Sequence, residues 1–497
     1  MSKPGDLKPK RTRAYHTRSK LGCLTCRKRR VRCDQARPAC SQCSNSGRTC
    51  DGYLTAAPTC AVSIAMKLPS VPNLTNHDEH RSLQYFTECT GPQFAGFHEH
   101  EFWCKTVLQI GASEQCVFHC VVALASLHEA FESEASPTKP MVIATIQLYK
   151  RATSHYTKAI SLLNMKIASH GWRSLDVSLL CCILCICFEG LRGSYADAEL
   201  HLTHGLSLLK QWASNRGSET GKLLPTSTEE IIHNSVAPVF NRLVIQAITV
   251  TDTSFPWESS MFACSEIQTF KDYKTARDSL YSMLARFYLS PHKPHGLPPG
   301  HSTIVTRMER SIGLSRWFNC YIRSSSMVES SFTLDKSSAA ILQATYATAR
   351  IITETDHLHD QMQFDKYHTE FKEIIKCITT YMASQTPSFS MELGVVSLLH
   401  FVSIKCRDPT IRRQAMALNE AARRELIWDS RAARRLEQEI LAIEEGEDNL
   451  VLEAQDVAAS SRIDRLDTRT NLGRRSMTMR FKRQGETEWS EERILSW

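Results

Sequence analysis

Apolar residues recur every three to four positions over most of the chain beyond residue 78, which is the spacing of an amphipathic α-helix. The strict alternation that marks a half-buried strand is rare in this region. We therefore predict a mainly all-α protein, with stacked antiparallel helices in one body that extends to about residue 445. The clearest helical segments are residues 103–131, 141–167, 175–191, 195–212 and 228–250.

A further helix is predicted after the dipeptide Asp408-Pro409, because proline is favoured in the first turn of a helix. Apolar residues then recur at helical spacing, and several arginines lie off that face. The apolar positions are Ile411, Ala415, Leu418, Ala422 and Leu426, and the arginines are Arg412, Arg413, Arg423 and Arg424.

The most apolar stretch, residues 177–188, is shorter than the ~20 residues that a membrane-spanning helix needs. We predict a buried helix there, with its four cysteines packed as small hydrophobic side chains, and no membrane partner. The polar C-terminal region, residues 446–497, contains the alternation Met477, Met479 and Phe481, which predicts one short strand.

Positive charge is concentrated in the first 52 residues. This segment holds fourteen Lys or Arg against three acidic residues, a balance of +11, although the net charge of the whole chain is only +8. Such a block is the electrostatic footprint of a segment that binds a polyanion. Residues 1–20 lack hydrophobic periodicity, so we expect a disordered basic arm that serves as a nuclear localisation signal or contacts a nucleic-acid backbone.

Six cysteines within the basic block form one unit, Cys-x2-Cys-x6-Cys, that occurs twice. They are Cys23, Cys26, Cys33, Cys40, Cys43 and Cys50. A Cys-x2-Cys pair lets two thiolates approach one metal ion, and zinc takes four such ligands. Two zinc ions need about eight ligand places, so six thiolates suffice only if two of them bridge both ions. The symmetry of the repeat assigns the bridges to Cys23 and Cys40.

Other interpretations of these cysteines are unpaired structural thiols, a mononuclear zinc site with spare cysteines, and an iron–sulfur cluster. Iron–sulfur clusters use four cysteines and would leave the twofold repeat unexplained. Because no histidine lies between Cys23 and Cys50, zinc fingers that use histidine fit poorly. The chain begins without the apolar segment of a secretory signal, so we expect a reducing intracellular compartment rather than disulfides.

The two halves of the cysteine unit differ in charge. Five of the six residues between Cys26 and Cys33 are basic, whereas Arg48 is the single basic residue between Cys43 and Cys50. We expect a short helix after each Cys-x2-Cys pair, the first facing the polyanion and the second acting as scaffold. The segment has few apolar residues, so its folding should depend on metal.

The cysteine spacing, with Pro38 two residues before the fourth cysteine, resembles the fungal binuclear zinc cluster transcription factors. The resemblance implies two Zn2+ ions, bridged by the first and fourth cysteines, and double-stranded DNA as the partner, read at CGG-type triplets in the major groove. It implies that Arg30 contacts guanine, which suits arginine, although many members carry lysine there. Arg29 is the second candidate for a base contact. The phosphate contacts are assigned to Lys20, Arg27, Lys28 and Arg32.

The helical body resembles the fungal-specific regulatory domain that commonly follows such clusters. The stretches that carry the likeness are LQYFTECTGPQFAGF, FHCVVALASLHEA, LLCCILCICFEGLRGSYADAELHLTHGLSLL and DPTIRRQAMALNEAARRELIWDS. The resemblance implies a nuclear regulator of RNA polymerase II genes that contacts transcription machinery or co-regulators and has no catalytic activity. No heptad repeat follows the cluster, so a homodimer formed through the large domain and a monomer both stay open.

The predicted organisation is a basic arm over residues 1–20, a zinc-cluster DNA-binding domain over 21–52, a linker over 53–78, an α-helical regulatory domain over 79–445 and the polar C-terminal region. Two other functions stay open. One is an enzyme or metabolite-binding helical domain with the cluster as an accessory, although no GxSxG, Walker or glycine-rich dinucleotide motif occurs. The other is a co-regulator that uses the cluster to contact protein. The HEHE motif at residues 98–101 offers metal-binding atoms, and we interpret it as surface.

Overall fold

The chain forms two compact units, Met1–Leu68 and Pro69–Trp497. The predicted basic arm and residues 53–76 of the predicted linker lie outside the part of the chain that the structure describes. The computed structural model describes residues 23–29, 31, 33–34, 36, 39–50, 77–96, 99–135, 142–215, 226–249, 255, 269–289, 301–326, 336–355, 360–383, 389–391, 394–421, 423–446 and 451–497.

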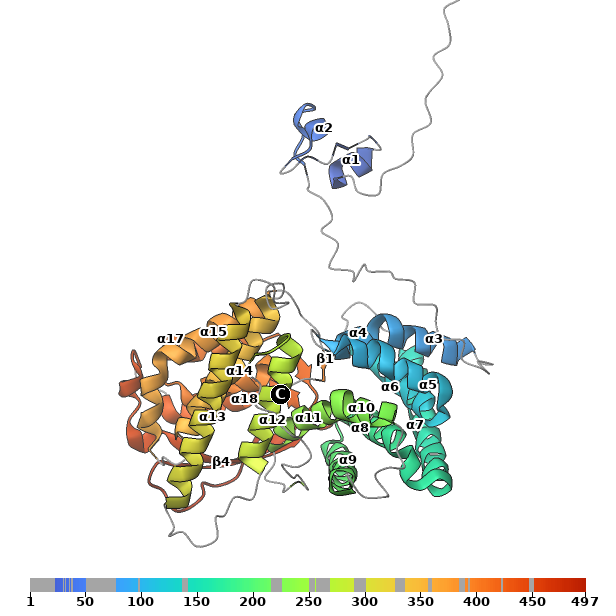
Figure 1. The fold of residues 1–497 in the computed structure, drawn as a ribbon. Helices are drawn as coiled ribbons and strands as arrows, with labels where there is room; N and C mark the ends of the chain where they lie inside the picture. The colour runs from blue at the N-terminus through green and yellow to red at the C-terminus, as the bar shows by residue number, and fades with distance from the viewer. Residues whose placement is uncertain are drawn as a thin grey trace, which may run out of the picture. The chain divides into compact units, whose positions relative to one another are not determined.

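The small unit holds two short helices, drawn in dark blue in Figure 1. Each begins directly after the first cysteine of one half of the cysteine unit, so the sequence repeat is also a structural repeat. The helices are α1 (Leu24–Arg29) and α2 (Ser41–Ser44).

The first part of the large unit is a stack of helices, as the apolar periodicity predicts (Figure 1). The helix predicted over residues 103–131 is interrupted at Glu114, whose backbone is extended (φ −114°, ψ 108°). In chain order, with η marking 3-10 or π-helical turns, the elements are α3 (His77–Tyr85), η1 (Phe86–Thr90), α4 (Gly91–Ala95), η2 (Phe102–Thr106), α5 (Val107–Ser113), α6 (Gln115–Ala135), α7 (Val142–His170), η3 (Gly171–Ser174), α8 (Leu175–Arg192), α9 (Tyr195–Asn215), α10 (Thr226–Ile231), η5 (Ile232–Val236) and α11 (Ala237–Ile248).

Helix α8 is the centre of the first apolar core. From Leu175 to Leu191 every residue except Asp176 is buried, which confirms the prediction of a buried helix. The helical run Ile143–Arg192 contains a window with the length and hydropathy of a membrane span, and 94% of that window is buried inside the protein. Burial of this kind is what a core helix of a folded domain shows.

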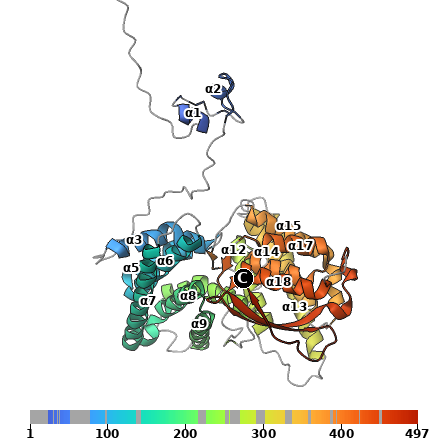
Figure 2. The same cartoon turned by 180° about the vertical axis from the view of Figure 1, so that it is seen from behind.

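The second part of the large unit adds more helices and two small sheets (Figures 1 and 2). Its helical elements are α12 (Tyr273–Leu289), α13 (His301–Ser325), α14 (Lys336–Thr355), η8 (Gln361–Tyr367), α15 (His368–Met382), α16 (Val395–Lys405), α17 (Pro409–Leu418), α18 (Ser430–Glu445), η9 (Ala454–Asp456) and η10 (Ala459–Ser461). The strands are β1 (Phe389–Ser390), β2 (Arg424–Glu425), β3 (Trp428–Asp429), β4 (Ile463–Asn471), β5 (Ser476–Arg483) and β6 (Arg493–Ser496).

Helix α17 begins where the sequence predicts and ends earlier. Asp408 caps it by accepting the backbone N–H groups of Thr410 (3.0 Å) and Ile411 (2.9 Å). The helix stops at Leu418 instead of continuing to residue 426. Strand β2 follows, and it pairs in parallel with β1 and antiparallel with β3. The helical spacing beyond Leu418 was therefore misleading, because pairing with a distant strand outweighs a local periodicity.

The β2–β3 hairpin connects helix ends that are far apart in the sequence. Arg424 donates from Nη2 to the carbonyl oxygen of Gly190 (2.8 Å) and from Nη1 to that of Leu191 (3.1 Å), at the C-terminal end of α8. The neighbouring Glu425 accepts three backbone N–H groups at the start of α16, from Gly394 (3.0 Å), Val395 (2.8 Å) and Val396 (3.1 Å). Each charge meets the helix end of opposite partial charge.

The polar C-terminal region is an ordered part of the large unit over residues 451–497. It forms an antiparallel sheet in the order β4-β5-β6, which runs beside α18 in Figure 2. Met477, Met479 and Phe481 alternate along β5, as predicted, and pack with α18 residues Leu436 and Ile440. The sheet therefore covers an apolar face of the last helix.

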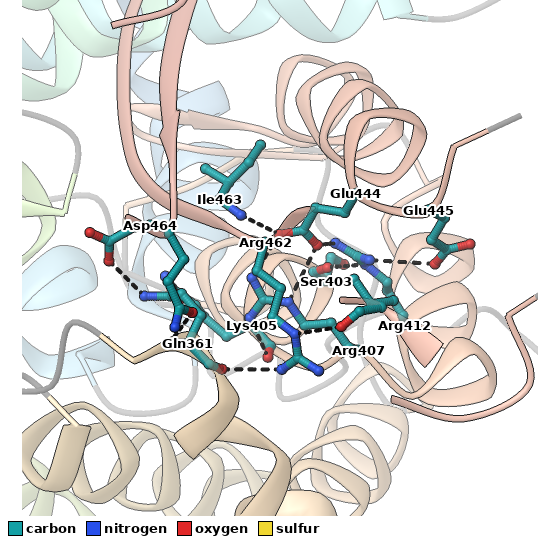
Figure 3. Close-up of polar contacts among 12 residues, drawn as sticks. Gln361, Ser403, Lys405, Arg407, Arg412, Glu444, Glu445, Arg462, Ile463 and Asp464 are labelled. Carbon is teal, nitrogen blue, oxygen red and sulfur yellow. Dashed lines mark hydrogen bonds and ion pairs between the residues drawn. The ribbon is translucent and has the colours of Figure 1, made fainter. Parts of the chain in front are cut away.

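A buried network of charges also holds this sheet (Figure 3). Glu444 on α18 accepts from Arg407 (2.7 Å) and Arg412 (2.5 Å), and its Oε1 also accepts the backbone N–H of Ile463 in β4 (2.8 Å). Arg462, directly before β4, makes two hydrogen bonds to Asp365 (2.8 and 2.9 Å). Arg412 was expected off the apolar face of its helix, and the structure instead buries it completely with its carboxylate partner.

We predict that Glu444→Gln lowers the free energy of unfolding by about 3 kcal/mol or more, because it leaves two buried guanidiniums without their shared anion. Burial by itself raises the pKa of Glu444, but Arg407 and Arg412 outweigh it and hold that pKa below the usual range. The stabilisation should therefore be present above the pKa of an unfolded glutamate, about 4.3, and be lost as the pH falls below it.

Denaturant unfolding of the full chain near pH 7 and near pH 3, well below the pKa of an unfolded glutamate, measures both effects. The matched control is Glu420→Gln, which removes an exposed carboxylate 2.6 Å from Arg434 and should cost under about 1 kcal/mol. Equal losses for the two variants would contradict the role given to Glu444.

Candidate metal centre and nucleic-acid interface

The buried core of the small unit, over its described residues, is made of cysteine side chains. Cys50 is half-buried and packs against the other five, at the edge of the cluster. A unit with a core this small has little hydrophobic free energy to fold on, so a metal must contribute it. The five buried members are Cys23, Cys26, Cys33, Cys40 and Cys43.

Four of the sulfur atoms have the separation expected around one zinc ion. Sγ of Cys23 lies 3.6 Å from Sγ of Cys40 and 3.7 Å from Sγ of Cys43. Sγ of Cys26 lies 3.6 and 3.8 Å from the same two atoms. A tetrahedron with Zn–S bonds of about 2.3 Å places its sulfurs about 3.8 Å apart. The two Cys-x2-Cys pairs therefore face each other at the distance of shared coordination.

Cys40 connects this group to the third cysteine. Cys33, Asp34 and Cys40 place ligand atoms within 4.8 Å of one another, and Cys40 also belongs to the four-sulfur group. Asp34 already accepts from the backbone N–H (3.1 Å) and the hydroxyl (2.6 Å) of Ser41, at the start of α2. Its carboxylate therefore orients the second half of the unit, and the sulfurs are the atoms left for a metal.

Without a metal ion the buried thiols of the cluster would be neutral. Burial raises the pKa of the Cys23 thiol to about 12 and also raises the pKa values of Cys26 and Cys40. These groups hold their protons at neutral pH unless a metal replaces them, since a bound divalent ion stabilises the thiolate. The sulfur donor set and its distances thus fit zinc.

The two helices present different surfaces. Lys28 and Arg29 on α1 are exposed, as is Val31, whereas α2 carries no charged residue. The guanidinium of Arg29 donates to the hydroxyl of Ser46 in the second half (2.9 Å). This bond, which was not predicted from the sequence, connects the basic helix to the second half of the cysteine unit. Lys20, Arg30 and Arg32, and the side chain of Arg27, lie outside the described residues.

Two further groups of residues in the large unit contain histidine and could be considered as metal sites. In the HEHE motif, Glu99 is buried and pairs with Arg242 (2.8 Å) and with Arg277, so it is part of an internal ion network. His100 is exposed, and His98 lies outside the described residues. A different group, Glu79, His119 and His155, is brought together from three helices. Sequence reasoning missed it because no spacing along the chain connects those residues.

Two family models match the chain. The fungal Zn(2)-Cys(6) binuclear cluster domain matches residues 21–59. The fungal specific transcription factor domain matches residues 81–483, which is most of the chain. The chain belongs to the fungal specific transcription factor family.

Relatives of this fungal transcription factor carry matching names. The chain is 28% identical over 242 residues to the aspercryptin biosynthesis cluster-specific transcription regulator atnN of Emericella nidulans. The matching region covers 42% of this chain and 37% of the relative. The chain is 26% identical to transcription regulator lscL of Purpureocillium lilacinum, over 45% of this chain and 55% of the relative. The chain thus spans about half or less of the length of these relatives. No solved structure matches it.

Several earlier predictions are thereby confirmed. The chain carries the two domains of a zinc-cluster transcription factor, and in chain order a mainly helical body follows the N-terminal zinc cluster. The cluster domain is one that binds two zinc ions.

We predict that a zinc chelator unfolds the small unit and leaves the large unit helical, because their cores are separate. Hydrogen exchange of the full chain measures this: peptides from residues 23–50 should lose protection on chelation, while peptides from α8 keep it. Circular dichroism should show little change, since most helices lie in the large unit. Retained protection of residues 23–50 without zinc would contradict a metal-dependent fold.

Proposed function

We propose that this transcription factor acts in the nucleus on RNA polymerase II genes and reads CGG-type triplets in duplex DNA through the first half of its cysteine cluster. The observation that carries the proposal is the contrast between the halves. Both have the same cysteine spacing and a short helix at the same offset, yet only the first is strongly basic. Metal binding alone would need no such difference.

The metal ligands in this proposal are the six cysteines, with Cys23 and Cys40 bridging two zinc ions. The shared position of Cys40 in both ligand groups supports its assignment as a bridge. The 3.6 Å separation between the sulfurs of Cys23 and Cys40 supports a pair that holds the same two ions. The terminal ligands are then Cys26, Cys33, Cys43 and Cys50.

The DNA contacts divide by chemistry. We assign the base contact to Arg30, since arginine can donate two hydrogen bonds to guanine O6 and N7. Lys28 is exposed at the surface of α1 and suits a phosphate contact, and we assign the same role to Lys20, Arg27 and Arg32. The hydrogen bond from Arg29 to Ser46 competes with a base contact, so we assign Arg29 to positioning the helix.

The domain organisation that we propose keeps the basic arm (residues 1–20), the zinc cluster (21–52), the linker (53–78) and the regulatory domain (79–445). Helix α3 begins at His77, close to the proposed end of the linker. Because β4–β6 pack on α18, we propose that residues 446–497 work as part of the regulatory domain. Co-regulators or a second copy of the chain are the partners that we expect for this domain.

We predict that Arg30→Ala weakens binding to a CGG site by about 1–3 kcal/mol and relaxes specificity at one base, because a bidentate guanine contact is lost. Arg27→Ala should instead weaken binding to all sequences alike and lower the salt slope by about one, as loss of a phosphate contact does. Titration of full-length protein against matched and mismatched duplexes at several salt concentrations separates the two.

The matched control for both variants is Arg48→Ala, which removes an exposed arginine from the second half of the cluster and should leave specificity intact. Unchanged CGG binding by Arg30→Ala would reject the assignment of the reading residue. Failure of the zinc-loaded protein to bind any duplex would favour a co-regulator that uses the cluster to contact protein.

We also predict that loss of a bridging cysteine removes more zinc than loss of a terminal one. Cys23→Ser and Cys40→Ser should each lower the zinc content by about two ions per chain, and Cys50→Ser by about one, because a bridge serves both ions. Cys89→Ser, which changes a half-buried cysteine outside the cluster, should lose none. Equal losses for Cys40→Ser and Cys50→Ser, measured by elemental analysis, would reject the bridge.

A further inference from the structure

Three helices of the large unit bring two imidazoles and a carboxylate together. Glu79 from α3, His119 from α6 and His155 from α7 each place a ligand atom within 4.8 Å of the other two. Nδ1 of His119 lies 2.9 Å from Nδ1 of His155, and Nε2 of His155 lies 3.9 Å from Oε1 of Glu79. His155 meets His119 through Nδ1 and Glu79 through Nε2, so the closeness of the three residues rests on the 4.8 Å grouping of one ligand atom from each.

The hydrogen bond between the imidazoles uses one nitrogen of each ring and leaves the other nitrogen of His119 outside it. Two Nδ1 atoms at this distance can share a hydrogen bond only if one ring carries the proton and the other does not. Nε2 of His119 is buried and has no hydrogen-bond partner among the described residues. No carboxylate or backbone carbonyl in that part of the chain holds either Nδ1. A cation placed between the rings would accept both lone pairs at once.

Both rings are in the protonation state that a metal needs. Burial, with smaller effects from Lys158 and His155, lowers the pKa of His119 to about 4. Burial also lowers the pKa of His155, although Glu79 opposes the shift. Neutral imidazoles at neutral pH offer lone pairs to a metal without first losing a proton.

The site is closed toward the core and reachable from solvent. His119 is 2% exposed, whereas the side chains of His155 and Glu79 are 13% and 15% exposed. Three protein ligands at such a position leave a fourth place for water or another donor. The positive charge of the neighbouring Arg151 is balanced by Asp78 at 2.6 Å, so it opposes a bound cation only weakly.

The donor atoms select the class of metal. Two imidazole nitrogens and one carboxylate suit zinc and its first-row neighbours better than magnesium or calcium, which prefer oxygen alone. Zinc–nitrogen bonds of about 2.1 Å place two ligands about 3.4 Å apart in a tetrahedron. To bind one ion through both Nδ1 atoms, the rings would have to separate by about half an ångström.

We propose that Glu79, His119 and His155 bind one divalent transition-metal ion, with zinc as the expected occupant, in addition to the two ions of the cysteine cluster. The ion joins α3 to α6 and α7. Helices α3 and α6 already meet through the hydroxyls of Ser82 and Ser126, 3.0 Å apart. Metal binding at this point stabilises the packing of the first helix of the regulatory domain.

The test compares zinc content in full-length chains that are stripped of metal and reloaded. The unaltered chain should bind one more zinc ion than either His119→Gln or His155→Gln. The matched control is His204→Gln, which changes an exposed histidine on α9 and should bind as much zinc as the unaltered chain. Because the result is a difference between chains, it does not depend on how many ions the cysteine cluster holds.

Cobalt(II) identifies which site has changed. Sulfur ligands add intense near-ultraviolet charge-transfer bands to its spectrum, while nitrogen and oxygen ligands give visible bands alone. His119→Gln should lose visible intensity and keep the thiolate bands. Glu79→Gln, closer to the surface, should keep the fold and weaken binding of the extra ion at least tenfold. Equal zinc content in the unaltered chain and both histidine variants would overturn the proposal and leave a structural hydrogen bond.

Discussion

The large unit depends on pairing between charged side chains and the free backbone groups of buried helix ends. Arg424 donates hydrogen bonds to the last carbonyls of α8, and Glu425 accepts hydrogen bonds from the first N–H groups of α16. The two residues are adjacent in one short strand, so the ends of two distant helices are held at a defined separation. Gln246 on α11 adds a third helix by donating to the carbonyl oxygen of Glu425 (2.9 Å). Without these partners the buried carbonyl of Leu191 and the first N–H groups of α16 would lose hydrogen bonds.

The small unit reaches a stable fold by a different route. Over its described residues, the core of this unit consists of thiols, whereas apolar side chains fill the large unit. Zinc coordination replaces hydrophobic burial as the source of its folding free energy. Because α1 does not need to bury an apolar face, its surface can carry basic residues. The proposed function therefore assigns metal binding and DNA contact to different residues, and the hydrogen bond from Arg29 to Ser46 joins the two halves of the cysteine unit.

Carboxylates of the large unit have two roles: some stabilise the fold through ion pairs, and one belongs to the proposed metal site. Glu444 and Glu99 are buried, and each is matched by two guanidiniums, so their ionic bonds are complete. Glu79 differs, because it lies beside two neutral imidazoles that share one hydrogen bond. A buried carboxylate whose charge is fully paired stabilises the fold. A carboxylate beside neutral imidazoles can instead contribute to a cation-binding site.

The sequence by itself determined the cysteine unit, the charge contrast between its halves and most of the helices, because spacing and periodicity act over a few residues. It also placed the start of α17, where Asp408 and Pro409 act locally. Tertiary structure decided where that helix ends, since β2 pairs with β1 from another part of the chain. It also decided that Glu79, His119 and His155 meet, because three separate helices supply them. Local signals cannot report contacts whose free energy comes from distant residues.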